Sequence, residues 1–142
     1  MNDPARGSRG ESETHRVACE GGCHCGAVRF RLQLPARVEV RRCTCSICRM
    51  TGYEHLTVRR EHFELLSGAD SLEEYRFNTG VARHLFCRHC GIKSFYVPRS
   101  HPHAYSVHLG CVDLPDSVCV NSGTIDGANW EASAGDFDGM EN

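Results

Sequence analysis

The chain has 142 residues, of which 40% are hydrophobic and 24% are charged, and its formal net charge is −2. This composition is typical of one globular domain and excludes a disordered chain. Because the net charge is slightly negative, the composition argues against a protein whose main task is to bind nucleic acid. Because no apolar run approaches the roughly 18 residues of a membrane span, and the N-terminus has no apolar stretch typical of a secretory signal, we expect a cytoplasmic protein.

Both ends of the sequence are expected to form flexible tails. Residues 1–16 are rich in Gly, Ser, Arg and Glu and show no hydrophobic periodicity, which is typical of segments outside a folded core. Residues 133–142 have the same character, with Phe137 as a candidate anchor. The ordered domain is therefore predicted to span residues 17–132.

Inside this domain, hydrophobic residues recur mainly with a period of two, which is typical of β-strands with one buried face. The clearest case lies between Ala27 and Leu34, where Val28, Phe30 and Leu32 alternate with polar residues. Further strands are predicted over residues 38–42, 55–59, 63–67, 73–78, 82–86, 93–97 and 105–109, and one helical turn over residues 46–51. The sequence thus predicts a mainly β domain with very little helix, and small domains of this kind often use a bound metal to supplement a limited core.

Ten cysteines are the most informative feature of the sequence. In a reducing cytosol such residues are more often metal ligands or catalytic thiols than disulfides. Seven of them form a CxC, a CxCxxC and a CxxC cluster: Cys23 and Cys25; Cys43, Cys45 and Cys48; Cys87 and Cys90. Glycines flank the first and last clusters, and they allow the tight turns, or zinc knuckles, in which two nearby cysteines bind one ion.

The number of clustered cysteines predicts one four-thiolate and one three-thiolate zinc site. Zinc prefers four tetrahedral ligands, and a structural site is closed by four protein ligands. The CxC and CxxC clusters together would form such a site. The CxCxxC cluster would then offer three thiolates and an exchangeable fourth position, as catalytic zinc sites do. Spacing alone also permits the CxCxxC cluster to share Cys87 and Cys90 instead.

Two other ligand sets are open for the CxCxxC cluster. A histidine could complete it as a second structural site, the candidates being His24, His55, His84, His89 and His108. An iron–sulfur cluster also accepts thiolate ligands, but the spacing matches neither common ferredoxin pattern. The isolated cysteines are expected to be small buried hydrophobic residues; they are Cys19, Cys111 and Cys119.

A zinc ion with three thiolates carries a formal charge of −1, so it is a weaker Lewis acid than a zinc ion held by neutral histidines. Such a site is suited to accept an incoming thiol as its fourth ligand and to keep it as a thiolate by lowering its pKa. The bound thiolate could then attack a small electrophile such as an aldehyde. Candidates for orienting the carboxylates of the substrate are the arginines near the clusters in sequence: Arg42, Arg49, Arg59 and Arg83.

Several longer motifs resemble the glutathione-dependent formaldehyde-activating enzyme family: GGCHCGAVRF, CTCSICRMTG, FNTGVARHLFCRHCGIKSFYVPRS and DGANWE, in the family's order over about residues 17–132. The resemblance implies a β-tent fold of packed antiparallel sheets and two zinc ions per chain. It implies that Cys23, Cys25, Cys87 and Cys90 bind a structural zinc, and that Cys43, Cys45 and Cys48 bind a catalytic zinc. The implied activity is that of a carbon–sulfur lyase, which joins glutathione and formaldehyde to S-(hydroxymethyl)glutathione.

Within the family, the motifs are closest to the centromere protein V branch, which suggests a non-catalytic zinc-binding interaction module as the alternative. Ile92 follows Gly91, where enzyme-branch members tend to have threonine. Two further residues have candidate roles. His84 could hydrogen-bond a zinc-bound thiolate or the substrate, and Trp130 is expected to fill the core beneath the C-terminal segment.

Overall fold

A computed structural model of the chain describes residues 15–126 and 141–142. Within these ranges the protein is mainly β, as predicted, and its single α-helix is α2, Ser46–Thr51. The strands are β1 Val17–Gly22, β2 Arg29–Leu34, β3 Arg37–Cys43, β4 Glu54–Arg59, β5 Phe63–Ser67, β6 Leu72–Tyr75, β7 His84–Cys87, β8 Phe95–Tyr96, β9 Ala104–His108 and β10 Cys119–Ile125. The described part contains no helix long and apolar enough to cross a membrane.

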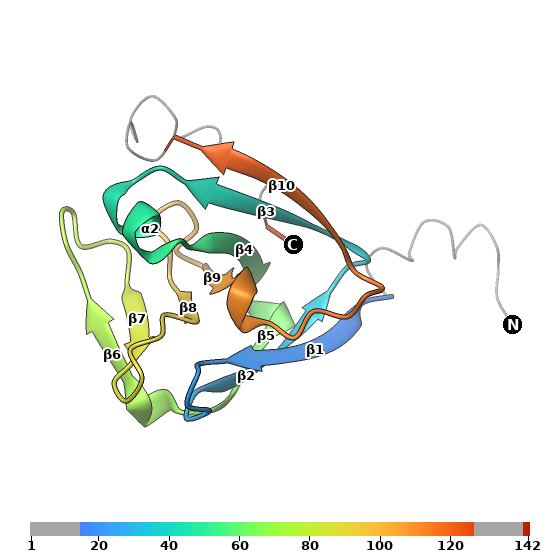
Figure 1. Cartoon of the computed structure of the whole chain (residues 1–142), viewed down its shortest axis with the longest axis horizontal. Helices are drawn as coiled ribbons and strands as arrows, with labels where there is room; N and C mark the ends of the chain where they lie inside the picture. Colours follow the sequence, from blue (N-terminus) through green and yellow to red (C-terminus); the bar gives the residue numbers. More distant parts are fainter. Residues whose placement is uncertain (1–14, 127–140) are drawn as a thin grey trace, which may run out of the picture.

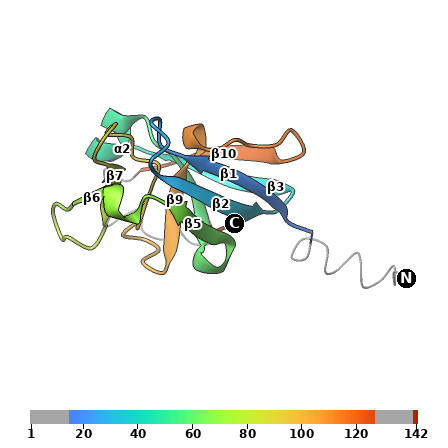
Figure 2. The ribbon, with the colours of Figure 1, turned by 90° about the horizontal axis from the view of Figure 1, so that it is seen from below.

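The strands form three sheets, with the orders β1-β2-β5, β10-β3-β4-β9-β8 and β6-β7. Neighbouring strands are antiparallel except β3 and β10, which pair in parallel from Arg37 opposite Cys119 to Cys43 opposite Ile125. β3 and β10 run along one side of the molecule and β1 and β2 along the other, with the β6–β7 hairpin at the end far from the start of β1 (Figure 1). The view from below shows β1, β2 and β5 side by side, with β2 in the middle (Figure 2).

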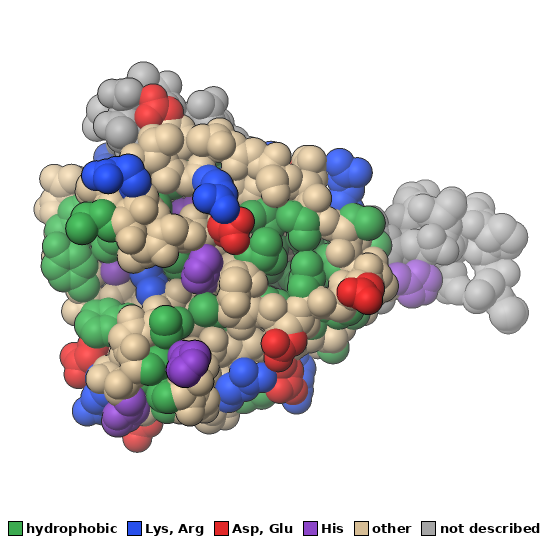
Figure 3. Space-filling model, in the orientation of Figure 1, with side chains coloured by type: hydrophobic (Ala, Val, Ile, Leu, Met, Phe, Trp, Pro, Cys, Tyr) green, Lys and Arg blue, Asp and Glu red, His purple; other side chains and the backbone are tan. Residues whose placement is uncertain are grey.

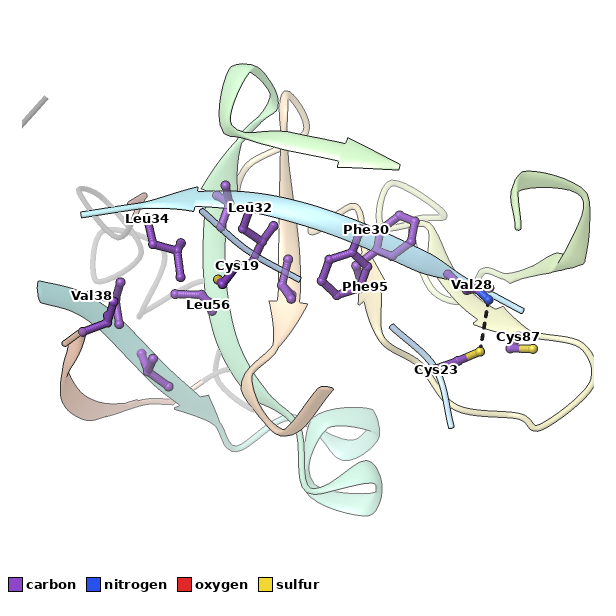
Figure 4. Packing of buried hydrophobic residues seen from close by; sticks show 14 residues of the cluster. Cys19, Cys23, Val28, Phe30, Leu32, Leu34, Val38, Leu56, Cys87 and Phe95 are labelled. Atoms are coloured by element: carbon purple, nitrogen blue, oxygen red, sulfur yellow. Dashed lines mark hydrogen bonds between the residues drawn. The ribbon is translucent and has the colours of Figure 1, made fainter. Parts of the chain in front are cut away.

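The main core lies between the three-stranded and five-stranded sheets. Val28, Phe30 and Leu32 are fully buried, so the alternation seen in the sequence does mark the inner face of β2. Burial of each such side chain contributes roughly 1.5–3 kcal/mol. The ring of Phe30 lies 5.4 Å from that of Phe63 and 5.8 Å from that of Phe95. Figure 4 shows that this core continues along β2 to the sulfur atoms of two clustered cysteines, Cys23 and Cys87.

Most predicted strands are present, and the helical turn occupies the predicted residues. The predicted strand over residues 73–78 ends at Tyr75, and Asn78 lies in a turn with a positive φ of 58°. Two strands, β1 and β10, were not predicted. Both contain glycine, and Gly22 is necessary in β1 because a Cβ atom there would lie 2.0 Å from the carbonyl oxygen of Val28. Such residues weaken the alternating pattern by which strands are predicted.

The predicted tails fall largely outside the described residues, as do Phe137 and Trp130. The last two residues of the chain are described, and Asn142 is buried. Its side-chain oxygen accepts a 2.7 Å hydrogen bond from the backbone amide of Glu39, and its side-chain nitrogen donates a 3.0 Å bond to the carbonyl oxygen of Thr57. The C-terminal residue thus bonds to both β3 and β4.

Candidate metal centres and the adjoining pocket

The first cysteine cluster combines two tight turns. Cys23 and Cys25 lie in the turn from β1 to β2, where the backbone amide of Val28 donates a 3.3 Å hydrogen bond to the sulfur of Cys23. Cys87 ends β7, and the amide of His89 donates a 3.4 Å bond to its sulfur. Each turn contains a glycine with positive φ, 86° at position 26 and 77° at position 91. Both turns therefore have the backbone conformation and the amide–sulfur bonds that stabilise thiolates.

The geometry of these four cysteines fits a zinc ion. The sulfur atoms of Cys23, Cys25, Cys87 and Cys90 all lie within 4.8 Å of one another. The sulfur of Cys25 is 3.7 Å from those of both Cys23 and Cys87. Four sulfurs in a tetrahedron around zinc, each at about 2.3 Å from the ion, are separated by about 3.8 Å. This site can therefore accept a tetrahedral ion with little movement.

Hydrogen bonds among the four cysteines of this site shift their pKa values in different directions. Burial opposes ionisation of Cys90, but backbone hydrogen bonds with Cys25 and Ile92 and bonds with the other thiols lower its pKa to about 6. The pKa of Cys23 is also below its usual value: burial raises it, while the Val28 amide and the thiols of Cys25 and Cys87 lower it by more. A backbone hydrogen bond with Ala27 lowers the pKa of Cys25, but burial and the bonds with the other three thiols raise it to about 11. Two of the four thiols thus have a lowered pKa and one has a raised pKa before any metal binds.

The second cluster is built from consecutive residues at the start of α2. Cys43 ends β3, and Cys45 is the residue that precedes the first turn of the helix, with extended backbone angles of −63° and 163°. Cys48 follows within the helix, so it lies above Cys45 on the same helical face. Gly52, in the left-handed conformation, ends the helix by donating its amide to the carbonyl of Cys48. One short turn therefore brings the three cysteines into one cluster. The donor atoms that lie within 4.8 Å of one another are those of Cys43, Cys48 and His55, and the sulfur of Cys45 is not in this set.

The three thiols form a strongly coupled acidic group. The sulfur of Cys45 interacts with the thiols of Cys43 and Cys48, and these hydrogen bonds lower the pKa of Cys45 to about 2. The same bonds raise the pKa values of Cys43 and Cys48. The cluster thus contains one thiolate at neutral pH even without metal, and the other two thiols ionise when a cation supplies the compensating charge.

His55 is the histidine that the structure brings to this cluster. Its Nε2 lies 3.1 Å from the sulfur of Cys48, and the donor atoms of Cys43, Cys48 and His55 lie within 4.8 Å of one another. Its Nδ1 lies 2.9 Å from the hydroxyl of Ser106 and 3.3 Å from that of Tyr96. Burial, followed by the charge of Lys93, lowers the pKa of His55 to about 3. The imidazole is therefore neutral, and it can either hydrogen-bond a thiolate or bind a metal.

A pocket of about 220 Å³ adjoins the second cluster. All three cysteines line it, together with His55, His84 and Tyr96 and with polar residues from two loops: Asn78, Thr79, Arg99 and Ser100. None of the four residues of the first cluster lines this pocket. Figure 3 shows histidine and basic side chains gathered on the face between α2 and the β6–β7 hairpin. A ligand in the pocket can reach the three-cysteine cluster, whereas the first cluster lies outside this pocket.

The arginines predicted to orient a substrate do not line the pocket. Arg42 and Arg83 form 3.0 Å ion pairs with Glu54 and Glu74, and Arg59 lies 3.5 Å from a carboxylate oxygen of Glu141. The lining arginines are instead Arg41, from the middle of β3, and Arg99. Position along the sequence could not identify them, because the pocket is formed where β3, α2, β7 and β8 meet in space.

The remaining cysteines and histidines are not brought to the three-cysteine cluster. Cys19 is buried, as predicted, and Cys111 is half-buried, but the prediction is wrong for Cys119, which is exposed on β10. His108 stacks on the ring of Tyr53 at 4.7 Å. His24 and His89 lie in the turns of the first cluster, where four thiols already complete the set.

Comparison with known proteins agrees with the resemblance read from the motifs. The sequence pattern of the family described as glutathione-dependent formaldehyde-activating enzyme matches residues 18–131. The chain belongs to this family. A protein of Halomonas elongata, named as a candidate glutathione-dependent formaldehyde-activating enzyme, is 62% identical over 33 residues, which are 23% of this chain. The chain spans about a fifth of that relative's length, 21%.

A solved structure supports the fold over a larger share of the chain. The crystal structure of a protein from Rhodobacter sphaeroides is 35% identical in sequence, with a TM-score of 0.62. The similarity covers 72% of this chain and 99% of that protein. Most of the chain therefore shares its fold with an experimentally determined structure.

Proposed function

We propose that this protein is a zinc-dependent carbon–sulfur lyase, which condenses glutathione or a similar thiol with formaldehyde or a similar small electrophile. The observation that carries the proposal is the position of Cys43, Cys45 and Cys48 on the wall of a pocket. Membership of the formaldehyde-activating family supports the choice of substrates. The Halomonas elongata relative adds support through its name.

The proposal assigns two zinc ions to the chain, with different tasks. Cys23, Cys25, Cys87 and Cys90 would bind a structural zinc, since their sulfur spacing fits a tetrahedron and they lie outside the pocket. Cys43, Cys45 and Cys48 would bind a catalytic zinc, which supplies the ability to hold an incoming thiol as a thiolate. The fourth position of this second site would face the pocket, and its zinc would be the more labile of the two because three ligands bind more weakly than four.

The residues of the chain perform the remaining work. The pocket is smaller than the 300–1,000 Å³ typical of sites for drug-sized ligands, so it suits the reacting end of a thiol and a small aldehyde. Its wall includes Tyr96 and Ile47, which reduce the access of water to the reacting atoms. Loop residues such as Asn78 and Ser100 offer hydrogen bonds to the rest of the thiol substrate at the pocket mouth.

The direct test is the exchange between free glutathione plus formaldehyde and their adduct, measured by exchange NMR spectroscopy. Wild-type protein should accelerate the exchange, and Cys45→Ser should lower the acceleration by at least about 10²-fold because the thiolate cluster loses its central member. Cys119→Ser is the matched control, since this cysteine is exposed and distant from the pocket lining. Equal rates for Cys45→Ser and wild type would refute the proposal.

The second candidate function is a non-catalytic zinc-binding interaction module of the centromere protein V kind. The observation that favours it is the 3.1 Å distance from His55 Nε2 to the sulfur of Cys48, because a histidine ligand would close the site. X-ray absorption of the zinc-loaded protein distinguishes the two. The lyase predicts that added glutathione brings a further sulfur to the metal, whereas the module predicts an unchanged set of three sulfurs and one nitrogen.

A further inference from the structure

A half-buried lysine contacts one of the histidines that line the pocket. Lys93 Nζ lies 2.7 Å from Nδ1 of His84, which lines the pocket. The ammonium group also lies 3.9 Å from the ring centre of Tyr96 and 4.8 Å from that of Tyr53. No carboxylate forms an ion pair with Lys93 among the residues that the structure describes. Its hydrogen-bonding capacity is thus directed at His84.

This contact fixes which nitrogen of His84 carries the proton. A charged lysine has three donors and no acceptor, so Nδ1 of His84 must accept and cannot carry a hydrogen. Burial and the charge of Lys93 together lower the pKa of His84 to about 4, against a raising effect of Cys45, so the ring is neutral at pH 7. Burial also lowers the pKa of Lys93 to about 8, against the raising effect of the nearby thiolates, which leaves the amine mainly charged. The neutral ring therefore carries its hydrogen on Nε2.

The Nε2 atom of His84 opens to the pocket. In the described ranges Nε2 makes no hydrogen bond. Among the described residues, the fully buried side-chain nitrogen and oxygen atoms that lack a partner belong to Arg16 and Ser94, so Nε2 of His84 is not fully buried. Nε2 is therefore reached from the space that His84 lines. The ring is held in place between Tyr96, at 4.8 Å and 14°, and Phe77, at 5.3 Å and 26°. A rigidly held N–H donor is thus available to a ligand in the cavity that the three cysteines also line.

We propose that His84 is a further catalytic residue, whose Nε2–H donates to the carbonyl oxygen of the electrophile, and that Lys93 is the positioning residue that maintains this tautomer. The inference rests on the proposed function, because it assigns a site for the second substrate of that reaction. It identifies that substrate by its chemistry as a small aldehyde, with a carbonyl oxygen that becomes negatively charged as the thiolate attacks.

The step balances in atoms and electrons. The sulfur of the thiolate substrate forms a bond to the carbonyl carbon, and the π electrons of the C=O bond move to the oxygen. The oxygen takes the proton of His84 Nε2 while Nδ1 takes one from the Lys93 ammonium group, which leaves a neutral ring and a neutral amine. One proton from pocket water then restores the pair, matching the proton that the thiol released earlier. The reverse reaction uses the same path, with the hydroxyl proton of the adduct returning to Nε2.

The first test measures the tautomer and needs no turnover. Long-range ¹H–¹⁵N NMR spectra of the zinc-loaded protein should show His84 protonated on Nε2 in the wild type. In Lys93→Met, which removes the donor at similar length, a mixture with the Nδ1–H form should appear. A wild-type His84 protonated on Nδ1, or spectra unchanged by Lys93→Met, would overturn the role of Lys93.

The second test measures exchange of glutathione and formaldehyde at saturating thiol. His84→Phe should lower the maximal rate by about 10²-fold or more, the range of a lost general acid, with the half-saturating thiol concentration unchanged. His84→Gln should recover part of the loss, because its amide is also a donor, and it serves if the phenylalanine variant does not fold. His103→Phe, at an exposed position, should match wild type. If both His84 variants had the same maximal rate as wild type, the inference would be overturned.

Failure of the inference is distinguishable from failure of the proposed function. The response of a cobalt-substituted site to glutathione, followed in the visible spectrum, depends on the three-cysteine site and not on His84. Wild-type protein that shows this response and catalyses exchange, with His84 variants equally active, refutes only the role of His84. Wild-type protein without either property refutes the proposed function and the catalytic role of His84 together.

Discussion

The two cysteine clusters use the same ligand atom but are built in different ways. Cys25 and Cys87 are 62 residues apart, and their cluster joins two turns from different sheets. Cys43, Cys45 and Cys48 come from a single turn of six residues, and their cluster lines a pocket. In the function we propose, this difference in connectivity separates a site that stabilises the fold from one that is open to a ligand. The following predictions test that division, beginning with the largest effect.

Cys87→Ser should have the largest effect, because it removes one of four ligands at a fully buried position where the cluster meets the main core. Structural zinc sites contribute about 10–16 kcal/mol of apparent binding energy at pH 7, which is comparable to the whole stability of a typical domain. We expect a largely unfolded protein with at most one weakly bound zinc. Circular dichroism during heating and zinc analysis measure both properties.

The control for this variant is Cys119→Ser, an exposed cysteine outside both clusters, which should unfold at the wild-type temperature. If Cys87→Ser retained cooperative unfolding within a few degrees of wild type, the first cluster would not be essential to the fold. The division between the two sites would then be incorrect.

Removal of metal should separate the two sites by lability. A mild chelator should take the zinc of the three-cysteine site first, with the far-ultraviolet circular dichroism unchanged, since that site lies in one local turn. Cys45→Ser should contain one zinc per chain where wild type contains two, and its unfolding temperature should change by only a few degrees. Simultaneous loss of both ions with unfolding would show that the second site is also structural.

The last predicted effect concerns pH. Burial, aided by the charge of Lys93, lowers the pKa of His84 from its usual 6.5 to about 4. Between these two values the unfolded chain binds a proton that the folded protein does not, so the free energy of unfolding rises with pH. We expect a loss of up to about 3 kcal/mol as pH falls from 6.5 to 4, from about 1.4 kcal/mol per pKa unit.

Denaturant titrations of wild type and His84→Gln at several pH values check this effect, with zinc content measured at each pH. The variant should show a shallower slope, because its side chain does not titrate. Identical slopes in the two proteins would mean that His84 is not held neutral in the fold.

The sequence predicted what depends on local pattern. The alternation of Val28, Phe30 and Leu32 indicated a buried strand face, and residues 46–51 were correctly predicted to form a helical turn. The CxC and CxxC clusters indicated two knuckles by their flanking glycines. Each of these features is decided within a few residues by side-chain period or backbone freedom, so a single sequence carries the information.

Features that depend on contacts between distant segments were not predictable in the same way. Lys93 belongs to the segment before β8, yet it contacts His84 at the start of β7. His55 was one of five histidine candidates, and only the pairing of β4 with β9 places it between Cys48 and Ser106. These relations follow from sheet order, which no local pattern specifies.

The long sequence separation within the first cluster also has a consequence for the rate of folding. The contact between Cys25 and Cys87 closes a loop that contains β2, β3, α2, β4, β5 and β6. Domains dominated by such distant contacts fold slowly, because the entropy of loop closure is lost before the contacts form. A zinc ion present during folding could bind one knuckle first and the second knuckle after the loop has closed. Refolding should therefore be faster when zinc is present from the start than when it is added after collapse.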